Sequence, residues 1–101
     1  MKKYILTIDQ GTTSTRAILF DKRGKKVCVK QMEFTQITPH SGWVLHNPEE
    51  IYQTVINVIK NVINDSMISP KEIASIAITN QRETVIVWDK VTKEPLYPAI
   101  V

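Results

Sequence analysis

A polar stretch, Asp9 to Arg16, separates two short apolar runs and most constrains how this chain can fold. The apolar runs cover residues 4–8 and 17–20, and both are rich in branched side chains, so each predicts a strand. The stretch between them includes one carboxylate, one glycine, four hydroxyl residues and one arginine. A tight turn needs only glycine and an asparagine or aspartate. The connection therefore has more hydrogen-bonding capacity than a turn requires.

A phosphate-binding loop would use each of these groups. Glycine lets the backbone approach a ligand, hydroxyl residues supply donors, and arginine offers a fixed positive fork. A carboxylate at the end of the first strand can hold a hydrated Mg²⁺ beside the phosphates. The stretch is neither a Walker loop nor a Gly-x-Gly dinucleotide motif, because no second glycine follows, and a polar hairpin turn that binds nothing stays the alternative. The candidate residues are Gly11, Thr12, Thr13, Ser14 and Arg16 for phosphate and Asp9 for the metal.

Composition indicates a globular chain and argues against a nucleic-acid partner. With 43% hydrophobic and 23% charged residues, the 101-residue chain is expected to be globular and to form one small domain. The net charge is +3, and the basic residues are scattered except for a cluster at 22–26 that predicts a hairpin tip around Gly24. Nucleic-acid binding would need basic residues gathered on one face, so we expect no nucleic-acid partner.

The cysteine content and the length of the apolar runs indicate in which cellular compartment the protein is expected. Cys28 is the only cysteine, which excludes an internal disulfide and fits a reducing cytoplasm. The first apolar run is short and is followed at once by polar residues, so we expect it to be neither a signal peptide nor a membrane span. His40 and His46 match no common metal-ligand spacing, so we expect no metal site there. The final apolar run, 96–101, stops without a turn, which predicts that the chain is part of something longer.

The middle of the chain predicts a crossover connection. Asn47 and Pro48 are strong helix-start residues, apolar residues then recur at helical spacing, and the helix is expected to end near 64–65. A strand at 73–78 follows, and a strand reached through a crossover helix should lie parallel to an earlier one, most simply the first. A third strand at 26–34 carries lysines that suit the sheet edge, which leaves the first strand inside.

Parallel pairing of the first and fourth strands would bring two polar loops to one edge of the sheet. The second loop, 79–84, follows the fourth strand and carries amide, guanidinium and carboxylate groups that could grip the hydroxyls of a small polyol. A solvated hairpin turn with a weak ion pair is the equal alternative. A fifth strand is expected at 85–89, and the chain should be extended from Pro95. The candidate polyol ligands are Arg82 and Glu83.

These residues closely resemble the FGGY family of carbohydrate kinases over essentially the whole chain. The resemblance identifies residues 1–101 as the amino-terminal part of the family's N-terminal domain, an incomplete domain. It implies an α/β, ribonuclease H-like fold of the actin and sugar-kinase superfamily. In this fold an antiparallel three-strand meander would be followed by a crossover helix, and the helix would lead to a fourth strand that joins the mixed sheet in parallel. The matching stretches are Asp9–Arg16, Gly42–Val44, His46, Ile78–Thr84 and Ala99–Val101.

The resemblance also implies an activity. The parent protein would use ATP and Mg²⁺ to phosphorylate glycerol to sn-glycerol 3-phosphate in glycerol uptake and catabolism. Residues of the first loop (Thr12, Thr13, Ser14, Arg16) would touch the nucleotide phosphates, Asp9 would lie near the metal, and Arg82 and Glu83 would bind glycerol. A kinase for another polyol or sugar, or a non-catalytic nucleotide-binding module on the same fold, is the alternative. The full-length protein is expected to be a cytoplasmic homo-oligomer.

Some expected features are absent or altered. The family usually has glutamate where Leu45 stands and aspartate where Asn47 stands; Asn47 keeps the helix cap, whereas Leu45 has no explanation in the sequence. A tryptophan of the glycerol pocket and the catalytic aspartate base are expected beyond Val101, so no catalytic residue is assigned here. Because phosphoryl transfer needs both sides of a closed cleft, we expect the isolated 101 residues to be inactive.

Overall fold

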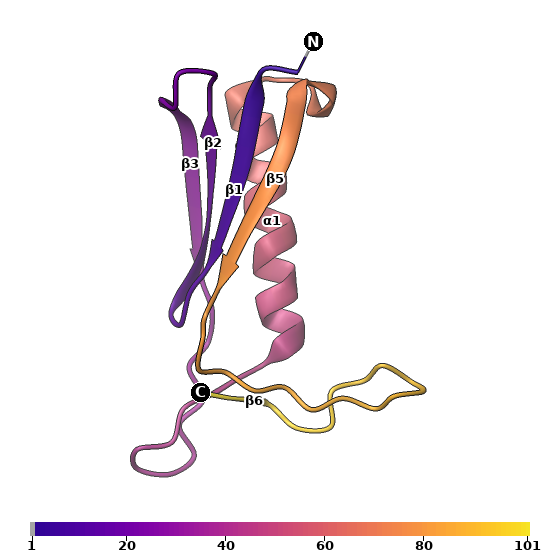
Figure 1. Cartoon of the computed structure of the whole chain (residues 1–101). Coiled ribbons are helices and arrows are strands. Elements are labelled where there is room, and N and C mark those ends of the chain that lie inside the picture. The colour runs from indigo at the N-terminus through magenta and orange to yellow at the C-terminus, as the bar shows by residue number, and fades with distance from the viewer. Residues whose placement is uncertain (1) are drawn as a thin grey trace.

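A computed structural model describes residues 2–101. Its main layer is a four-stranded sheet with one long helix against one face (Figure 1). The strand order is β3-β2-β1-β5. The first three strands pair antiparallel, and β5 pairs parallel to β1. This confirms the meander, the interior first strand, the edge position of the third and the parallel fourth. The elements of this layer are β1 (Tyr4–Gln10), β2 (Ser14–Phe20), β3 (Lys26–Glu33), α1 (Pro48–Ser66), the short 3₁₀ helix η1 (Pro70–Glu72) and β5 (Ile73–Asn80).

The crossover helix α1 begins and ends where its capping residues dictate. The Asn47 side chain accepts a hydrogen bond of 3.0 Å from the Glu49 N–H, and proline occupies the first turn. The helix ends as Met67 enters the left-handed region with φ 60° and donates its N–H to the Asn64 carbonyl. The predicted capping box at 69–72 is also present, because Ser69 and Glu72 bond each other's backbone.

The core lies between α1 and the β1–β2–β3 part of the sheet. One buried polar pair belongs to it: the Thr15 and Thr54 hydroxyls lie 2.7 Å apart and tie the start of β2 to the helix. The helix does not reach over β5, so Ile76 and Ile78 are exposed although their partners on β1 are buried. No helix in the described part of the chain is long and apolar enough to cross a membrane. The buried apolar cluster consists of Leu6, Ala17, Leu19, Val58 and Val62.

The hairpin between β2 and β3 forms as its sequence predicts. Gly24 has φ 79°, which only glycine adopts without strain. The Asp21 carboxylate accepts the N–H groups of Lys25 and Arg23. These bonds, the Lys25 N–H first, lower the pKa of Asp21, because they favour the charged form. The hairpin lies at the end of the sheet opposite the polar loops (Figure 1).

The strand expected at 85–89 is a wrong prediction. This segment makes only isolated bridges, Val85 with Ile100 and Trp88 with Pro95, and its apolar side chains are exposed. Proline has no N–H to donate, so Pro95 and Pro98 interrupt any continuous ladder along the facing segment. A strand forms instead at the end of the chain, where β6 (Ala99–Ile100) pairs antiparallel with β4 (Leu45–His46).

Candidate functional site

The first polar loop is shorter than its sequence suggests. Strand β1 extends to Gln10 and β2 begins at Ser14, so only residues 11–13 lie outside the sheet. The expectation of two short strands around an eight-residue connection is therefore corrected. Polar side chains do not end a strand when backbone pairing continues, and the register joins Asp9 to Arg16 and Gln10 to Thr15. One of the four hydroxyls, that of Thr15, is buried and hydrogen-bonded to Thr54 of α1, so it cannot contact a ligand.

The carbonyl groups of this loop are bound by the protein. The Thr12 carbonyl accepts from the Gln36 side-chain amide at 3.1 Å, and the Thr13 carbonyl accepts from the Phe34 N–H at 3.3 Å. The Ser14 carbonyl accepts from the Gly11 N–H at 2.9 Å. Within residues 2–101, the N–H groups of Thr12 and Thr13 donate to no protein atom. Free N–H groups on a tight loop are the arrangement that anions use.

Gly11 is required by the closeness of this turn. A Cβ atom at position 11 would lie 3.2 Å from the Ser14 carbonyl oxygen, a backbone atom that cannot easily move aside. The neighbouring Ser14 hydroxyl is 2.7 Å from the Gln31 side-chain nitrogen, which donates to it. Ser14 can still donate its own O–H to a ligand, and Thr12 and Thr13 are exposed.

Asp9 and Arg16 form a cross-strand ion pair beside the loop. The Asp9 Oδ2 atom lies 3.1 Å from an Arg16 guanidinium nitrogen, and the two side chains are 45 and 46% exposed. No group of three or more histidine, cysteine, aspartate or glutamate side chains gathers among the described residues. Mg²⁺ commonly keeps several waters and takes one or two carboxylates plus phosphate oxygens. The half-exposed Asp9 carboxylate, although paired with Arg16, lies next to a phosphate-type loop and can supply such a ligand.

The second polar loop lies at the same end of the sheet. Register pairs Asp9 with Thr79 and Gln10 with Asn80, so β1 and β5 end together (Figure 1). The Gln81 amide donates to the Gln10 side-chain oxygen at 3.2 Å, and the Thr84 hydroxyl donates to the Gln81 oxygen. The predicted convergence of two loops from distant sequence is confirmed by this contact.

Arg82 and Glu83 lie on this second loop. Both are exposed, and neither makes an ion pair with another described residue. The expected alternative, a weak local ion pair within a solvated turn, is therefore not formed. Their charged groups are available to an external ligand, one as donor and one as acceptor.

His46, for which no metal role is expected, is buried and is linked to the first loop through the Gln36 side chain. It has no exposed surface, and its ring lies edge-on against Phe34 with centroids 4.8 Å apart. Burial lowers the pKa of His46, and the nearby Glu50 carboxylate opposes this only partly. The ring is therefore neutral at pH 7.

A buried neutral histidine makes stability depend on pH. In the unfolded chain His46 takes up a proton below about pH 6.5, whereas in the folded protein its pKa is lower. The unfolded state therefore binds more protons as the pH falls, and we expect the free energy of unfolding to drop between pH 7.5 and pH 5.5. Urea titrations at both values should give a smaller drop for His46→Phe. The exposed His40→Phe is the matched control, and an unchanged drop in His46→Phe would contradict the assignment.

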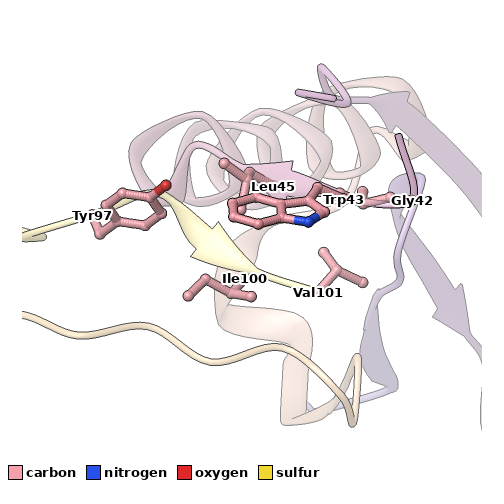
Figure 2. A pocket seen from close by; sticks show the side chains of 7 residues that line it. Gly42, Trp43, Leu45, Tyr97, Ile100 and Val101 are labelled. Carbon is pink, nitrogen blue, oxygen red and sulfur yellow. The ribbon is translucent and has the colours of Figure 1, made fainter. Parts of the chain in front are cut away.

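An apolar pocket of about 510 Å³ lies beside β4 and β6, and none of the predicted site residues lines it. Figure 2 shows the Trp43 ring and Leu45 on one side of β6, with Ile100 and Val101 across from them. Few polar groups line it, so it does not suit a polyol. Leu45 is 5% exposed and pairs with both Ile37 and Ile100, which gives this unexplained residue a structural role.

Sequence reasoning missed the supporting glutamines. Gln31 and Gln36 bond the first loop, and Gln10 and Gln81 join the two loops. Gln81, one of the amide residues of the second loop, has its side-chain nitrogen engaged with Gln10. A glutamine in a strand or connection has no sequence signature for such a role, because its partners come from distant segments.

The chain is similar in sequence to one protein family and to several curated proteins. Residues 4–101 match the model of the FGGY family of carbohydrate kinases, N-terminal domain. The chain is 60% identical over 101 residues to a glycerol kinase of Bacillus subtilis and 57% identical over 100 residues to one of Halothermothrix orenii. These alignments cover 100 and 99% of this chain and 20% of each relative. The chain thus spans about a fifth of the length of the curated relatives it matches.

Solved structures give the same picture. A Plasmodium falciparum glycerol kinase with ADP superposes with a TM-score of 0.83 at 37% identity, covering 97% of this chain and 20% of that one. A ligand-bound xylulose kinase from Lactobacillus acidophilus superposes with a TM-score of 0.88 at 29% identity, covering 98 and 19%. The mixed sheet with its crossover helix is therefore the sugar-kinase fold, and the predicted fold class is confirmed.

Proposed function

Because the chain belongs to the FGGY family of carbohydrate kinases, we propose that the whole protein transfers the γ-phosphoryl group of ATP to glycerol, yielding sn-glycerol 3-phosphate. Residues 1–101 would form the amino-terminal part of its N-terminal domain. The observation that supports a two-substrate site most directly is the Gln81–Gln10 hydrogen bond, which joins a phosphate-type loop to a polyol-type loop. Identities of 57–60% to named glycerol kinases favour glycerol as the acceptor.

The nucleotide phosphates are assigned to the first loop. The Thr12 and Thr13 N–H groups and hydroxyls and the Ser14 hydroxyl would donate to phosphate oxygens, and Arg16 would add positive charge. Asp9 would hold a hydrated Mg²⁺, which when bound neutralises charge on the transferred phosphoryl group. The pairing of Asp9 with Arg16 keeps both side chains at the rim of the loop. Positioning of this kind is the main protein contribution to phosphoryl transfer.

The acceptor is assigned to the second loop. The Arg82 guanidinium would donate to glycerol oxygens, while the Glu83 carboxylate would accept from glycerol hydroxyls. The base that removes the hydroxyl proton, and the rest of the acceptor pocket, would lie beyond Val101. The 101 residues alone are therefore expected to bind nucleotide weakly and to show no turnover. The whole protein would work in the cytoplasm as a homo-oligomer.

A substrate panel tests this proposal. The whole protein is incubated with ATP, Mg²⁺ and glycerol, xylulose or gluconate, and ADP release is measured in a coupled assay. Glycerol should give a kcat/KM at least about 100-fold above the sugars, because the relatives that share 57–60% identity with this chain are named glycerol kinases. A preference for xylulose or gluconate would favour a kinase for another substrate. ATP binding without glycerol-dependent ADP release would favour a non-catalytic module.

A further inference from the structure

A chain of hydrogen bonds runs from a buried histidine to the first loop. The His46 Nε2 atom lies 2.8 Å from the Gln36 Oε1 atom, and the Gln36 Nε2 atom lies 3.1 Å from the Thr12 carbonyl oxygen. His46 belongs to β4 and has no exposed surface. Its Nδ1 atom is buried and has no hydrogen-bond partner among the described residues. A buried polar atom without a partner is costly, and among the described residues the Nε2–Gln36 bond is the one side-chain hydrogen bond that offsets the burial of this ring.

The contacts of Gln36 set the direction of this chain. Its amide nitrogen faces two carbonyl oxygens, those of Thr12 and Phe34, and an amide nitrogen only donates. Its amide oxygen must therefore face His46 and accept. The His46 proton then resides on Nε2, which leaves Nδ1 bare and neutral, in keeping with the lowered pKa of the ring.

The Thr12 carbonyl controls a donor of the loop. It belongs to the same planar peptide unit as the Thr13 N–H, and in a trans peptide the two groups point in opposite directions. Because Gln36 holds the carbonyl toward the protein body, the Thr13 N–H is turned away from it, and it donates to no atom of the described residues. Releasing Gln36 would let this peptide unit rotate.

We propose that Gln36, held in place by His46, is a positioning residue that aims the Thr13 N–H at a nucleotide phosphate. The proposal rests on the function proposed above and adds a support to the first loop. Neither side chain touches the nucleotide. Their contribution is preorganisation, so it should affect nucleotide binding and leave glycerol binding unaffected.

The test compares variants of the whole protein. Gln36→Met removes the side-chain hydrogen bonds to Thr12, Phe34 and His46 at nearly constant volume. It should raise the KM for ATP, and weaken ADP binding measured by calorimetry, about tenfold, as expected for one misdirected hydrogen bond. The KM for glycerol should change less than about twofold. The exposed Gln53→Met is the matched control on α1 and should leave all three values unchanged.

Two variants of His46 distinguish a positioning role of this residue from a purely structural role. His46→Phe keeps an aromatic ring against Phe34 but loses the donor, whereas His46→Gln places an amide nitrogen near the Nε2 position. His46→Gln should restore ATP and ADP affinity toward wild type relative to His46→Phe. Equal losses in ATP and glycerol KM together with a lower melting temperature, or no recovery in His46→Gln, would overturn the proposal.

Different results would overturn the proposed function and the positioning role of Gln36. A wild-type protein without glycerol kinase activity would overturn the proposed function, and the positioning role would then be decided by ADP calorimetry alone. A wild-type protein that phosphorylates glycerol, with Gln36→Met leaving ADP affinity unchanged, would overturn only the positioning role.

Discussion

Replacing Arg82 with alanine is expected to raise the KM for glycerol of the whole protein by about 100-fold, while the KM for ATP changes less than about threefold. A charged donor contributes about 1.5–3 kcal/mol to a hydrogen bond, and each 1.4 kcal/mol is a factor of ten in affinity. Arg82 is exposed, makes no ion pair with a described residue, and follows the strand that ends beside β1. Its removal should therefore leave the fold intact.

Steady-state kinetics of matched variants would check this result. Arg82→Lys keeps the charge but loses the planar fork, so its KM for glycerol should lie between those of wild type and Arg82→Ala. Arg23→Ala is the control, because Arg23 is exposed in the hairpin at the opposite end of the sheet. Equal increases in the KM for glycerol and for ATP would argue against Arg82 as an acceptor-side ligand.

Changing Asp9 to asparagine is expected to lower kcat by on the order of 100-fold, the cost typical of losing one electrostatic contact to a transition state. Asparagine keeps the shape and can still accept from Arg16, so stability should hardly change, since exposed ion pairs contribute little. The Mg²⁺ concentration for half-maximal rate should also rise, because the ligand has lost its charge.

A second surface ion pair supplies the control for Asp9. Asp65 on α1 pairs with Lys30 on β3, away from both polar loops, so Asp65→Asn should leave kcat and the Mg²⁺ requirement unchanged. If Asp9→Asn lost activity in proportion to a lower melting temperature, with no change in Mg²⁺ dependence, a structural role would replace the metal-site assignment.

Much of the fold follows from local sequence signals. Asn47 and Pro48 define the start of α1, and the crossover they begin requires β5 to run parallel to an earlier strand. That pairing alone predicts that Asp9 and the residues after Thr79 meet at one edge. The polar loops could be predicted because each carries more donors and acceptors than a turn needs.

What the sequence does not reveal depends on partners distant along the chain. Residues 85–89 have the composition of a strand, but the prolines of the facing segment prevent a ladder. Leu45 pairs with Ile37 and Ile100, and Gln36 contacts Thr12 and His46, so neither role can be recognised from neighbouring residues. Likewise, the Thr15 hydroxyl is indistinguishable in sequence from its neighbours, and only its bond to Thr54 shows that it is structural.

A crystal structure of the whole protein with ADP, Mg²⁺ and glycerol tests the two-loop site most directly. We expect phosphate oxygens within hydrogen-bond distance of the Thr12 and Thr13 N–H groups, and glycerol oxygens in contact with Arg82 and Glu83. Phosphates bound by other elements, or glycerol bound away from residues 80–84, would contradict it.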